Sequence, residues 1–243
     1  MTGTSLLQAR GLACGYGASV VVRDLDLDVG AGEVVALLGA NGAGKTTTLL
    51  TLAGSLAPIG GEIRFDGDRI DRWPAPRIAR RGVASIPDDR GLFPKLTVRE
   101  NLQLAGRRRR HARDPLELFP DLQSRRGAPA GLLSGGQQQM LAIARALLRE
   151  PRLLLIDELS FGLSPIAVQR LLPIVRAVAD ETRAGVLLVE QHVHLGLAIA
   201  ERAYVLRHGT VTLSGTAAQL RDDASLLKES YLGSTDDNER TNA

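Results

Sequence analysis

The chain has 243 residues, of which 44% are apolar and 23% are charged, and its formal net charge is +3. This length fits one α/β domain, alone or with an added lobe, and the apolar content is ample for a core. No apolar run approaches the ~18 residues of a membrane span, and the N-terminus lacks the apolar stretch of a signal peptide. We therefore expect a soluble chain, and the mild positive charge does not favour nucleic acid as a partner. Cys14 is the only cysteine, so an internal disulfide is excluded and a buried structural thiol is expected.

The first strands are predicted in residues 6–29, where apolar and polar side chains alternate, as in VVVRDLDLDV. This alternation is typical of an antiparallel edge sheet. Tyr16 lies between Gly15 and Gly17, so its ring is expected to stand exposed on a turn. Such a ring is often only surface packing, but it can also stack on a nucleobase. The glycine-rich segment that follows favours stacking.

That segment is GANGAGKT, residues 39–46, which fits the spacing G-x-x-x-x-G-K-[ST] of a phosphate-binding loop. The apolar run EVVALLG before it predicts a buried strand, and KTTTLLTLAG after it predicts a helix that ends at Gly54. The alternative is a glycine-rich turn that matches the spacing by chance. The flanking strand and helix, in the order that a phosphate site requires, weigh against that alternative.

The residue types in this loop suit a nucleotide. Gly39, Gly42 and Gly44 allow backbone conformations in which N–H groups crowd around an anion at a helix N-terminus. Lys45 can place a compact positive charge on the β- and γ-phosphates, and the hydroxyl of Thr46 can take a Mg²⁺ position. The loop therefore predicts a nucleoside triphosphate site.

The middle of the chain is predicted to be largely helical after two short strands. GGEIRFDG and VASIP predict the strands, and Pro87 ends the second. Thr97 and Glu100 form a capping box for the helix VRENLQLA, and DPLELF, residues 114–119, predicts another helix start. The run RRRR at residues 107–110 is either a solvated helix end or a contact for anionic lipid headgroups or an acidic partner.

A second helix start suited to an anion lies in LLSGGQQQMLAIARALLREP, residues 132–151. Apolar residues recur at helical spacing after Ser134, Gly135 and Gly136, and Pro151 is predicted to end the helix. A Ser-Gly-Gly helix start can bind an anion, although by spacing alone it can also be a simple cap.

The segment RLLLIDE predicts a buried strand that ends in Asp157 and Glu158. Open α/β sheets bind ligands at the carboxyl ends of their strands. There, one acid can join the Mg²⁺ shell while its neighbour orients a water molecule. Two adjacent acids on a surface turn are the alternative, which the phosphate loop makes less favourable.

The remaining elements complete an α/β pattern. Ser164 and Pro165 start a helix predicted to reach Asp180, with a kink or a break at Pro173. GVLLVEQH predicts another buried strand and AYVLRHGTVTLSG a β-hairpin, followed by two short helices. The polar tail, residues 234–243, is predicted to be disordered.

With these motifs identified, the chain resembles the ATP-binding subunits of ABC transporters over nearly its whole length. GANGAGKT, LSGGQ and LLLIDE occur in the order and spacing of that family, and FPKLTVRENL, FGLSP, LLVEQ and ESYLG are similar to its branched-chain amino acid importer group. The resemblance implies an α/β fold in a single ATPase domain, residues 1–233. It would have a P-loop NTPase (RecA-like) core, an N-terminal antiparallel β subdomain and an inserted α-helical subdomain. The core would span residues 1–87 and 151–233, and the helical subdomain would span residues 88–150.

The resemblance also implies ATP and Mg²⁺ as cofactors. Adenine would stack on Tyr16, Thr46 and Asp157 would hold Mg²⁺, and Glu158 would be the general base, a role that contributes about 10²–10⁴-fold in rate. The phosphates would lie on Gly39, Ala40, Asn41, Gly42, Ala43, Gly44, Lys45, Thr46 and Thr47. The signature residues would instead close over the γ-phosphate bound to a second ATPase subunit; they are Ser134, Gly135, Gly136 and Gln137.

Three positions depart from the family pattern. Asp88 stands where most members have glutamine, and this acid is expected to weaken the coordination of Mg²⁺ or water. The usual switch histidine falls on Gln191, with His192 one residue later. Gln191 can donate a hydrogen bond to a γ-phosphate but cannot take a proton. The residue that senses the γ-phosphate is therefore either Gln191 or His192. Leu159 replaces the proline after Glu158, which we expect to relax the backbone there with a modest effect.

The implied partners are a second ABC ATPase subunit, two membrane permease subunits contacted through the helical subdomain, and an extracytoplasmic substrate-binding protein. The ATPase pair would be a homodimer or, as the resemblance favours, two unlike subunits at the cytoplasmic face of the membrane. The alternatives are an exporter ATPase of the lipopolysaccharide-export type and a soluble ABC ATPase acting on ribosomes or DNA. The latter usually has two cassettes or a coiled-coil insertion, and a P-loop kinase would lack LSGGQ.

Overall fold

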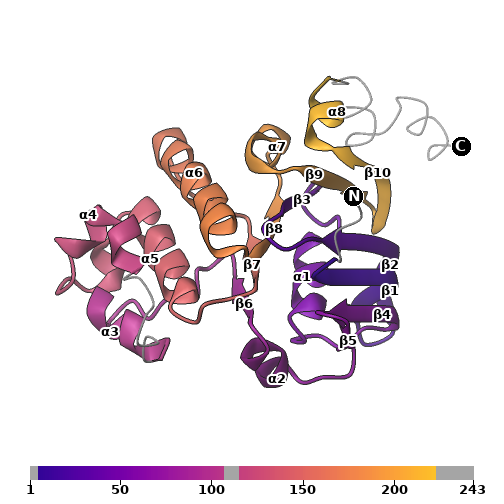
Figure 1. The fold of residues 1–243 in the computed structure, drawn as a ribbon, viewed down its shortest axis with the longest axis horizontal. Helices are drawn as coiled ribbons and strands as arrows, with labels where there is room; N and C mark the ends of the chain where they lie inside the picture. Colours follow the sequence, from indigo (N-terminus) through magenta and orange to yellow (C-terminus); the bar gives the residue numbers. More distant parts are fainter. Residues whose placement is uncertain (1–4, 107–114, 223–243) are drawn as a thin grey trace, which may run out of the picture.

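The computed structural model describes residues 5–106 and 115–222, which form two sheets and the helices around them (Figure 1). The strands are β1 (Leu7–Tyr16), β2 (Ser19–Val29), β3 (Val34–Leu38), β4 (Gly60–Phe65), β5 (Asp68–Arg69), β6 (Val83–Ile86), β7 (Leu153–Asp157), β8 (Gly185–Glu190), β9 (Arg202–Arg207) and β10 (Thr210–Thr216). The α-helices are α1 (Lys45–Leu52), α2 (Ala75–Arg80), α3 (Val98–Leu104), α4 (Pro120–Gln123), α5 (Gly135–Leu147), α6 (Pro165–Thr182), α7 (Val193–Ile199) and α8 (Ala217–Asp222). Two 3₁₀ turns are η1 (Pro115–Leu118) and η2 (Ala130–Leu132).

The larger sheet has the strand order β10-β9-β3-β8-β7-β6. Strands β9, β3, β8, β7 and β6 run parallel, and β10 pairs antiparallel with β9 as the predicted hairpin. The register sets Leu38 beside Glu190 and Asp157 beside Val189. Because parallel strands end at the same edge of a sheet, the carboxyl ends of β3, β8, β7 and β6 meet there.

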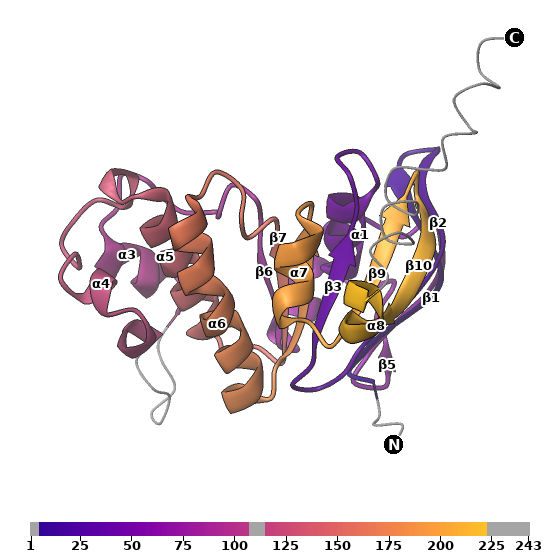
Figure 2. The same ribbon diagram turned by 90° about the horizontal axis from the view of Figure 1, so that it is seen from above.

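Strand β3 is buried on both faces, which explains its continuous apolar sequence. Val34, Ala36 and Leu38 belong to one core with the inner side chains of α5, α6 and α7. Val35 and Leu37 belong to a second core with α1 and the smaller sheet. The predicted α/β fold with an antiparallel β subdomain is confirmed, and α5 and α1 lie on opposite sides of β6 and β7 (Figures 1 and 2).

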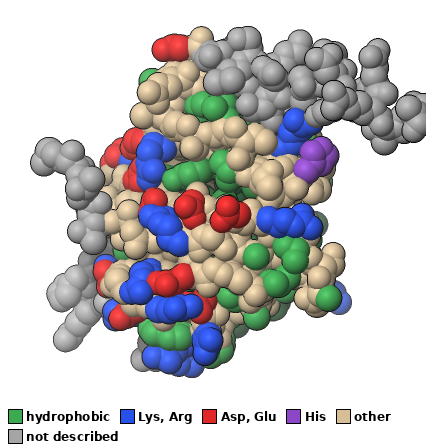
Figure 3. All heavy atoms as spheres, turned by 90° about the vertical axis from the view of Figure 1, so that its right-hand side faces the viewer, with side chains coloured by type: hydrophobic (Ala, Val, Ile, Leu, Met, Phe, Trp, Pro, Cys, Tyr) green, Lys and Arg blue, Asp and Glu red, His purple; other side chains and the backbone are tan. Residues whose placement is uncertain are grey.

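The smaller sheet has the order β2-β1-β4-β5 and is antiparallel, as the alternation in residues 6–29 predicts. Acidic and basic side chains are interspersed on the molecular face viewed from this side (Figure 3). Arg10 pairs with Asp28 at 2.6 Å and Arg69 with Asp71 at 2.7 Å. On this face, positive and negative side chains therefore partly offset one another.

Helices α3, α4 and α5 lie together beside α6, away from the smaller sheet (Figure 2). The capping box predicted at Thr97 is confirmed: the Glu100 amide donates to Thr97 Oγ1 at 3.2 Å, and the Thr97 amide donates to Glu100 Oε2 at 2.8 Å. The segment DPLELF is a 3₁₀ turn rather than the start of an α-helix. Pro120 has no N–H to extend that turn, and Phe119 before it has φ −132° and ψ 70°. Asp114 and residues 107–110 lie outside the described residues.

Of the kink or break predicted at Pro173, the break is excluded, because α6 continues from Pro165 to Thr182. Pro173 and Gln169, one turn earlier, are both exposed. Water can therefore satisfy the carbonyl of Gln169, which has lost its helical donor. On the inner side, buried Leu172 and Val175 hold the helix against the sheet. The predicted second short helix after the hairpin and the predicted disordered tail fall outside the described residues.

Candidate functional site

Four strand ends bring the predicted site residues to one edge of the larger sheet. The phosphate loop begins at Gly39, directly after β3, and β7 ends in Asp157 with Glu158 next. Gln191 follows β8, which lies between β3 and β7, and Asp88 follows β6 on the far side of β7. Residues far apart in the sequence therefore share the edge at which open α/β sheets bind ligands.

The glycines of the phosphate loop are required by backbone shape and by close packing. Gly42 has φ 79° and Gly44 has φ 107°, in the left-handed region that favours glycine. A Cβ at Gly44 would lie 2.4 Å from Val22 Cγ2, and one at Gly39 would lie 2.4 Å from the carbonyl oxygen of Leu206. The loop is thus fitted tightly against β2 and β9, and α1 begins at Lys45 as predicted.

Lys45 links the phosphate loop to the acidic end of β7. Its side chain is buried, and Nζ donates to the carbonyl oxygens of Gly39 at 2.9 Å and Ala40 at 3.1 Å. The same Nζ lies 3.4 Å from Glu158 Oε1. A single ammonium group therefore contacts both the loop and the carboxylate predicted to be the general base.

Asp157 is the buried carboxylate of the site. Burial is the main cause that raises its pKa, to about 6, and the nearby carboxylates of Glu158 and Asp88 act in the same direction. A hydrogen bond from Thr46 and the charge of Lys45 oppose this rise in pKa. Among the described residues, no group donates a hydrogen bond to Asp157 Oδ1. An orphaned carboxylate oxygen beside a threonine hydroxyl fits the oxygen ligands that Mg²⁺ prefers.

Replacing Asp157 by asparagine is expected to stabilise the nucleotide-free chain at neutral pH. The folded-state pKa of Asp157 lies above its ordinary value of 3.8, so its contribution to stability is present below pH 3.8 and is lost as the pH rises through about 6. Asparagine removes a cost of about 3 kcal/mol at pH 7.5, which corresponds to about 6–12 °C in Tm. Calorimetry in EDTA at pH 7.5 and pH 4.5 would test this, and an equal Tm difference at both pH values would contradict it.

The backbone of Glu158 is strained, and the expectation that Leu159 restricts it less than a proline would stays a prediction. Glu158 has φ 47°, in the left-handed region that costs a residue with a Cβ roughly 1–2 kcal/mol. Leu159 is fully buried, and a proline in its place would restrict Glu158 to extended conformations. The Glu158 amide donates to the carbonyl oxygen of Val189 at 3.0 Å, which ties this turn to the end of β8.

Asp88, Gln191 and His192, which are expected to lie near the attacking water or the γ-phosphate, are at the same edge of the larger sheet. Asp88 is exposed and accepts a hydrogen bond from the Asp89 amide at 2.8 Å, and its charge reaches Asp157. Gln191 is half-buried, and exposed His192 occupies the N-cap position of α7. The charge of His192 acts to lower the pKa of Glu190, while burial is the main cause that raises that pKa. Gln191 and His192 both stay candidates for the phosphate sensor.

Tyr16 and the signature segment occupy separate places. Tyr16 is 53% exposed at the turn between β1 and β2, as predicted. The Gln137 amide donates to Ser134 Oγ at 3.3 Å and the Ser134 amide to Gln137 Oε1 at 3.1 Å, a capping box at the start of α5. Because α5 packs on the sheet face opposite α1, the signature segment does not close over the phosphate loop of its own chain.

Sequence reasoning missed Arg90, which connects three segments near the site. Its guanidinium donates to Gln138 Oε1 at 2.8 Å, to Gln139 Oε1 at 3.2 Å and to the carbonyl oxygen of Phe161 at 3.3 Å. Arg90 thereby joins the segment after Asp88 to α5 and to the loop after Glu158. With twenty-seven arginines in the chain, no sequence signal distinguishes this one.

Comparisons with known proteins agree with this geometry. The family model of the ABC transporter matches residues 22–160. The chain is 42% identical over 224 residues to the high-affinity branched-chain amino acid transport ATP-binding protein BraG of Pseudomonas aeruginosa, covering 90% of this chain and 95% of that protein. It is 36% identical over 236 residues to the lipopolysaccharide export system ATP-binding protein LptB of Escherichia coli, covering 93% and 97% respectively. A solved structure of an ATP binding subunit of an ABC transporter matches with a TM-score of 0.77 at 33% identity, covering 94% of this chain and 98% of that one.

The chain therefore belongs to the ABC transporter family, as the ATPase subunit that binds and hydrolyses ATP to drive transport. No helix within residues 5–106 and 115–222 is long and apolar enough to cross a membrane.

Proposed function

We propose that this ATPase subunit powers the import of branched-chain or related amino acids. The higher identity to BraG than to LptB supports import over lipopolysaccharide export. The observation that carries the catalytic role is the meeting of Lys45, Asp157 and Glu158 at one sheet edge, with Lys45 Nζ 3.4 Å from Glu158 Oε1. This arrangement supplies a phosphate cation, a metal ligand and a base in one place.

Each group has a distinct task in hydrolysis. The amides of the phosphate loop and Lys45 bind the phosphates, and Tyr16 stacks on adenine. Thr46 and Asp157 would hold Mg²⁺, which would supply positive charge to offset that of the phosphates. Glu158 takes a proton from the attacking water, and Gln191 or His192 contacts the γ-phosphate. Asp88, at the edge of this cluster, lacks the amide N–H of the glutamine that most family members have there, which weakens the coordination of water or Mg²⁺.

The phosphate site is half of a catalytic site. Ser134, Gly135, Gly136 and Gln137 start α5 on the other side of β6 and β7 from the loop, so they are free to serve a different nucleotide. A second ABC ATPase subunit would place its own equivalent segment over the γ-phosphate held here. The pair would sandwich two nucleotides, and hydrolysis would reopen it.

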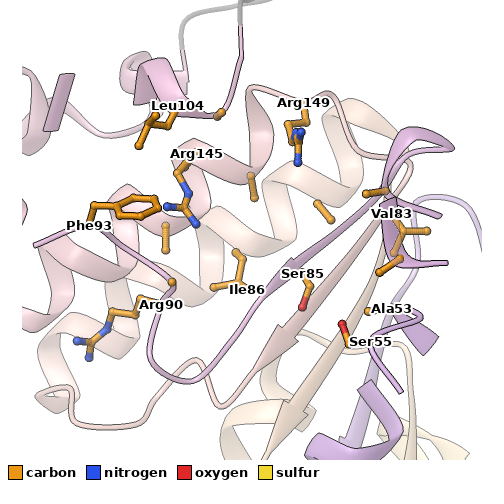
Figure 4. Close-up of a pocket in the computed structure, with 17 residues that line it drawn as sticks. Ala53, Ser55, Val83, Ser85, Ile86, Arg90, Phe93, Leu104, Arg145 and Arg149 are labelled. Atoms are coloured by element: carbon orange, nitrogen blue, oxygen red, sulfur yellow. The ribbon is translucent and has the colours of Figure 1, made fainter. Parts of the chain in front are cut away.

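Docking of the permease subunits is supported by a cavity of about 390 Å³ between the core and the helices beside α6 (Figure 4). Its wall includes exposed Phe93 and Leu104 together with Arg90, Arg145 and Arg149. The Arg145 guanidinium lies 5.9 Å from the centre of the Phe93 ring. Apolar side chains beside arginines suit a short permease helix with an apolar face and an acidic residue. An extracytoplasmic binding protein would deliver the substrate to those permeases.

The import function is tested by deleting the gene and measuring the uptake of labelled leucine. We expect uptake to be lost, restored by the parent chain and not restored by the Glu158→Gln variant, whereas glucose uptake stays unchanged as the control. Normal leucine uptake together with a loss of lipopolysaccharide from the outer membrane would overturn import and support the exporter alternative.

A further inference from the structure

Three hydrogen bonds tie the turn that carries Glu158 to the end of β8. The Glu158 amide donates to the carbonyl oxygen of Val189 at 3.0 Å. Two residues later, the Ser160 amide donates to Glu190 Oε1 at 3.0 Å, and the Ser160 hydroxyl donates to Glu190 Oε2 at 2.8 Å. Both oxygens of one carboxylate therefore hold one residue of the turn.

Glu190 is 1% exposed, which makes it one of the few buried charged residues of the described chain. Burying a carboxylate is unfavourable, so an apolar residue at this inward position of β8 would make the folded chain more stable. The register places Glu190 beside Leu38, the residue before the phosphate loop, and Gln191 follows it directly. Glu190 thus lies between the loop, the Glu158 turn and the candidate phosphate sensors.

The contact between Ser160 and Glu190 restrains the strained backbone of Glu158. A residue with a Cβ keeps a φ of 47° only where the surrounding structure over-determines it. The hydrogen bonds from the turn to Val189 and Glu190 supply that restraint on both sides of Leu159. Without the hydrogen bonds from Ser160 to Glu190, the turn would be free to relax. The Glu158 carboxylate would then be free to move away from Lys45.

We propose that Glu190 is a positioning residue for hydrolysis, which holds Ser160 and thereby sets the place of the Glu158 carboxylate. The inference rests on the proposed role of Glu158 as the base. Glu190 itself does not touch the reacting atoms.

The test compares Glu190→Gln, Ser160→Ala, Ser160→Thr and the double variant Glu190→Gln/Ser160→Ala in the full chain. The first two are each expected to lower kcat for ATP about tenfold, because small misplacements of a catalytic group are costly, with KM changed by less than about twofold. Ser160→Thr keeps the hydroxyl and should retain most of the activity. The double variant should be no slower than the slower single variant, because both changes break the same contact.

Glu33→Gln is the matched control. Glu33 also accepts a hydrogen bond from a backbone amide, that of Gly30 at 2.6 Å, but it lies before β3 at the opposite edge of the sheet. Its replacement should leave kcat unchanged.

The inference would be overturned if Glu190→Gln and Ser160→Ala had the kcat of the parent chain. It would also be overturned if the fold-loss of kcat in the double variant were the product of the two single losses. If Glu190→Gln fails to fold, the comparison of Ser160→Ala with Ser160→Thr tests the inference instead. Equal kcat values for these two variants would overturn the positioning role. The Glu158→Gln variant is measured alongside. If that variant is inactive while the Glu190 and Ser160 variants behave as the parent, only the positioning role fails; if it is active, the base assignment fails.

Discussion

The Glu158→Gln variant is expected to bind ATP with the affinity of the parent and to hydrolyse it about 10²–10⁴-fold more slowly. Glutamine keeps the shape of the side chain but cannot take a proton from water. Glu158 is the carboxylate 3.4 Å from the Lys45 ammonium, at the edge where the four strands end. Phosphate release at saturating Mg-ATP measures kcat, and a fluorescent ATP analogue measures the affinity.

The control for this variant is again Glu33→Gln, which removes a carboxylate of similar exposure far from the site. Hydrolysis by Glu158→Gln at the parent rate would show that another group activates the water. A large loss of ATP affinity would show instead that Glu158 acts mainly through Lys45.

Replacing Lys45 by alanine is expected to weaken ATP binding about 10–100-fold, because it removes charge-assisted hydrogen bonds to phosphate worth about 1.5–3 kcal/mol each. Lys45→Arg should not restore binding, since the buried side chain sits where its ammonium contacts two loop carbonyls and a planar guanidinium does not fit that geometry. Calorimetric titration with Mg-ATP measures the affinity.

Lys95→Ala is the control, because Lys95 is an exposed lysine in the segment that follows β6. It should bind ATP as the parent does. An unchanged affinity in Lys45→Ala would contradict the assignment of the phosphate loop.

The features that could be predicted from the sequence have short-range causes. Gly39 to Thr46 are contiguous, so their spacing alone defines a loop that binds phosphate. The capping box at Thr97 and the helix cap at Ser134 need partners only three residues away. The apolar runs of β3 and β7 are continuous because both faces of the larger sheet are covered.

The features that escaped prediction depend on contacts between distant segments or on exposure. Ser160 and Glu190 are 30 residues apart, and Arg90 and Phe161 are 71 apart, so neither pair leaves a local pattern. The effect of Pro173 depends on which side of α6 meets water. The φ of Glu158 reflects the turn held by β8, which no propensity of the residue itself indicates.

We propose that the phosphate loop is half of a site and that the signature segment of another subunit completes it. The most direct measurement is the mass of the Glu158→Gln chain by light scattering with and without Mg-ATP. We expect the 26.0 kDa chain to double in mass with Mg-ATP. Adding Ser134→Arg should prevent the doubling while ATP still binds, whereas adding Thr97→Arg, which removes a similar helix cap, should not. A dimer that forms equally well with Ser134→Arg would contradict the claim. If the chain alone stays monomeric, the same comparison is made with the unlike ATPase subunit added, and a mixed dimer that tolerates Ser134→Arg would contradict the claim.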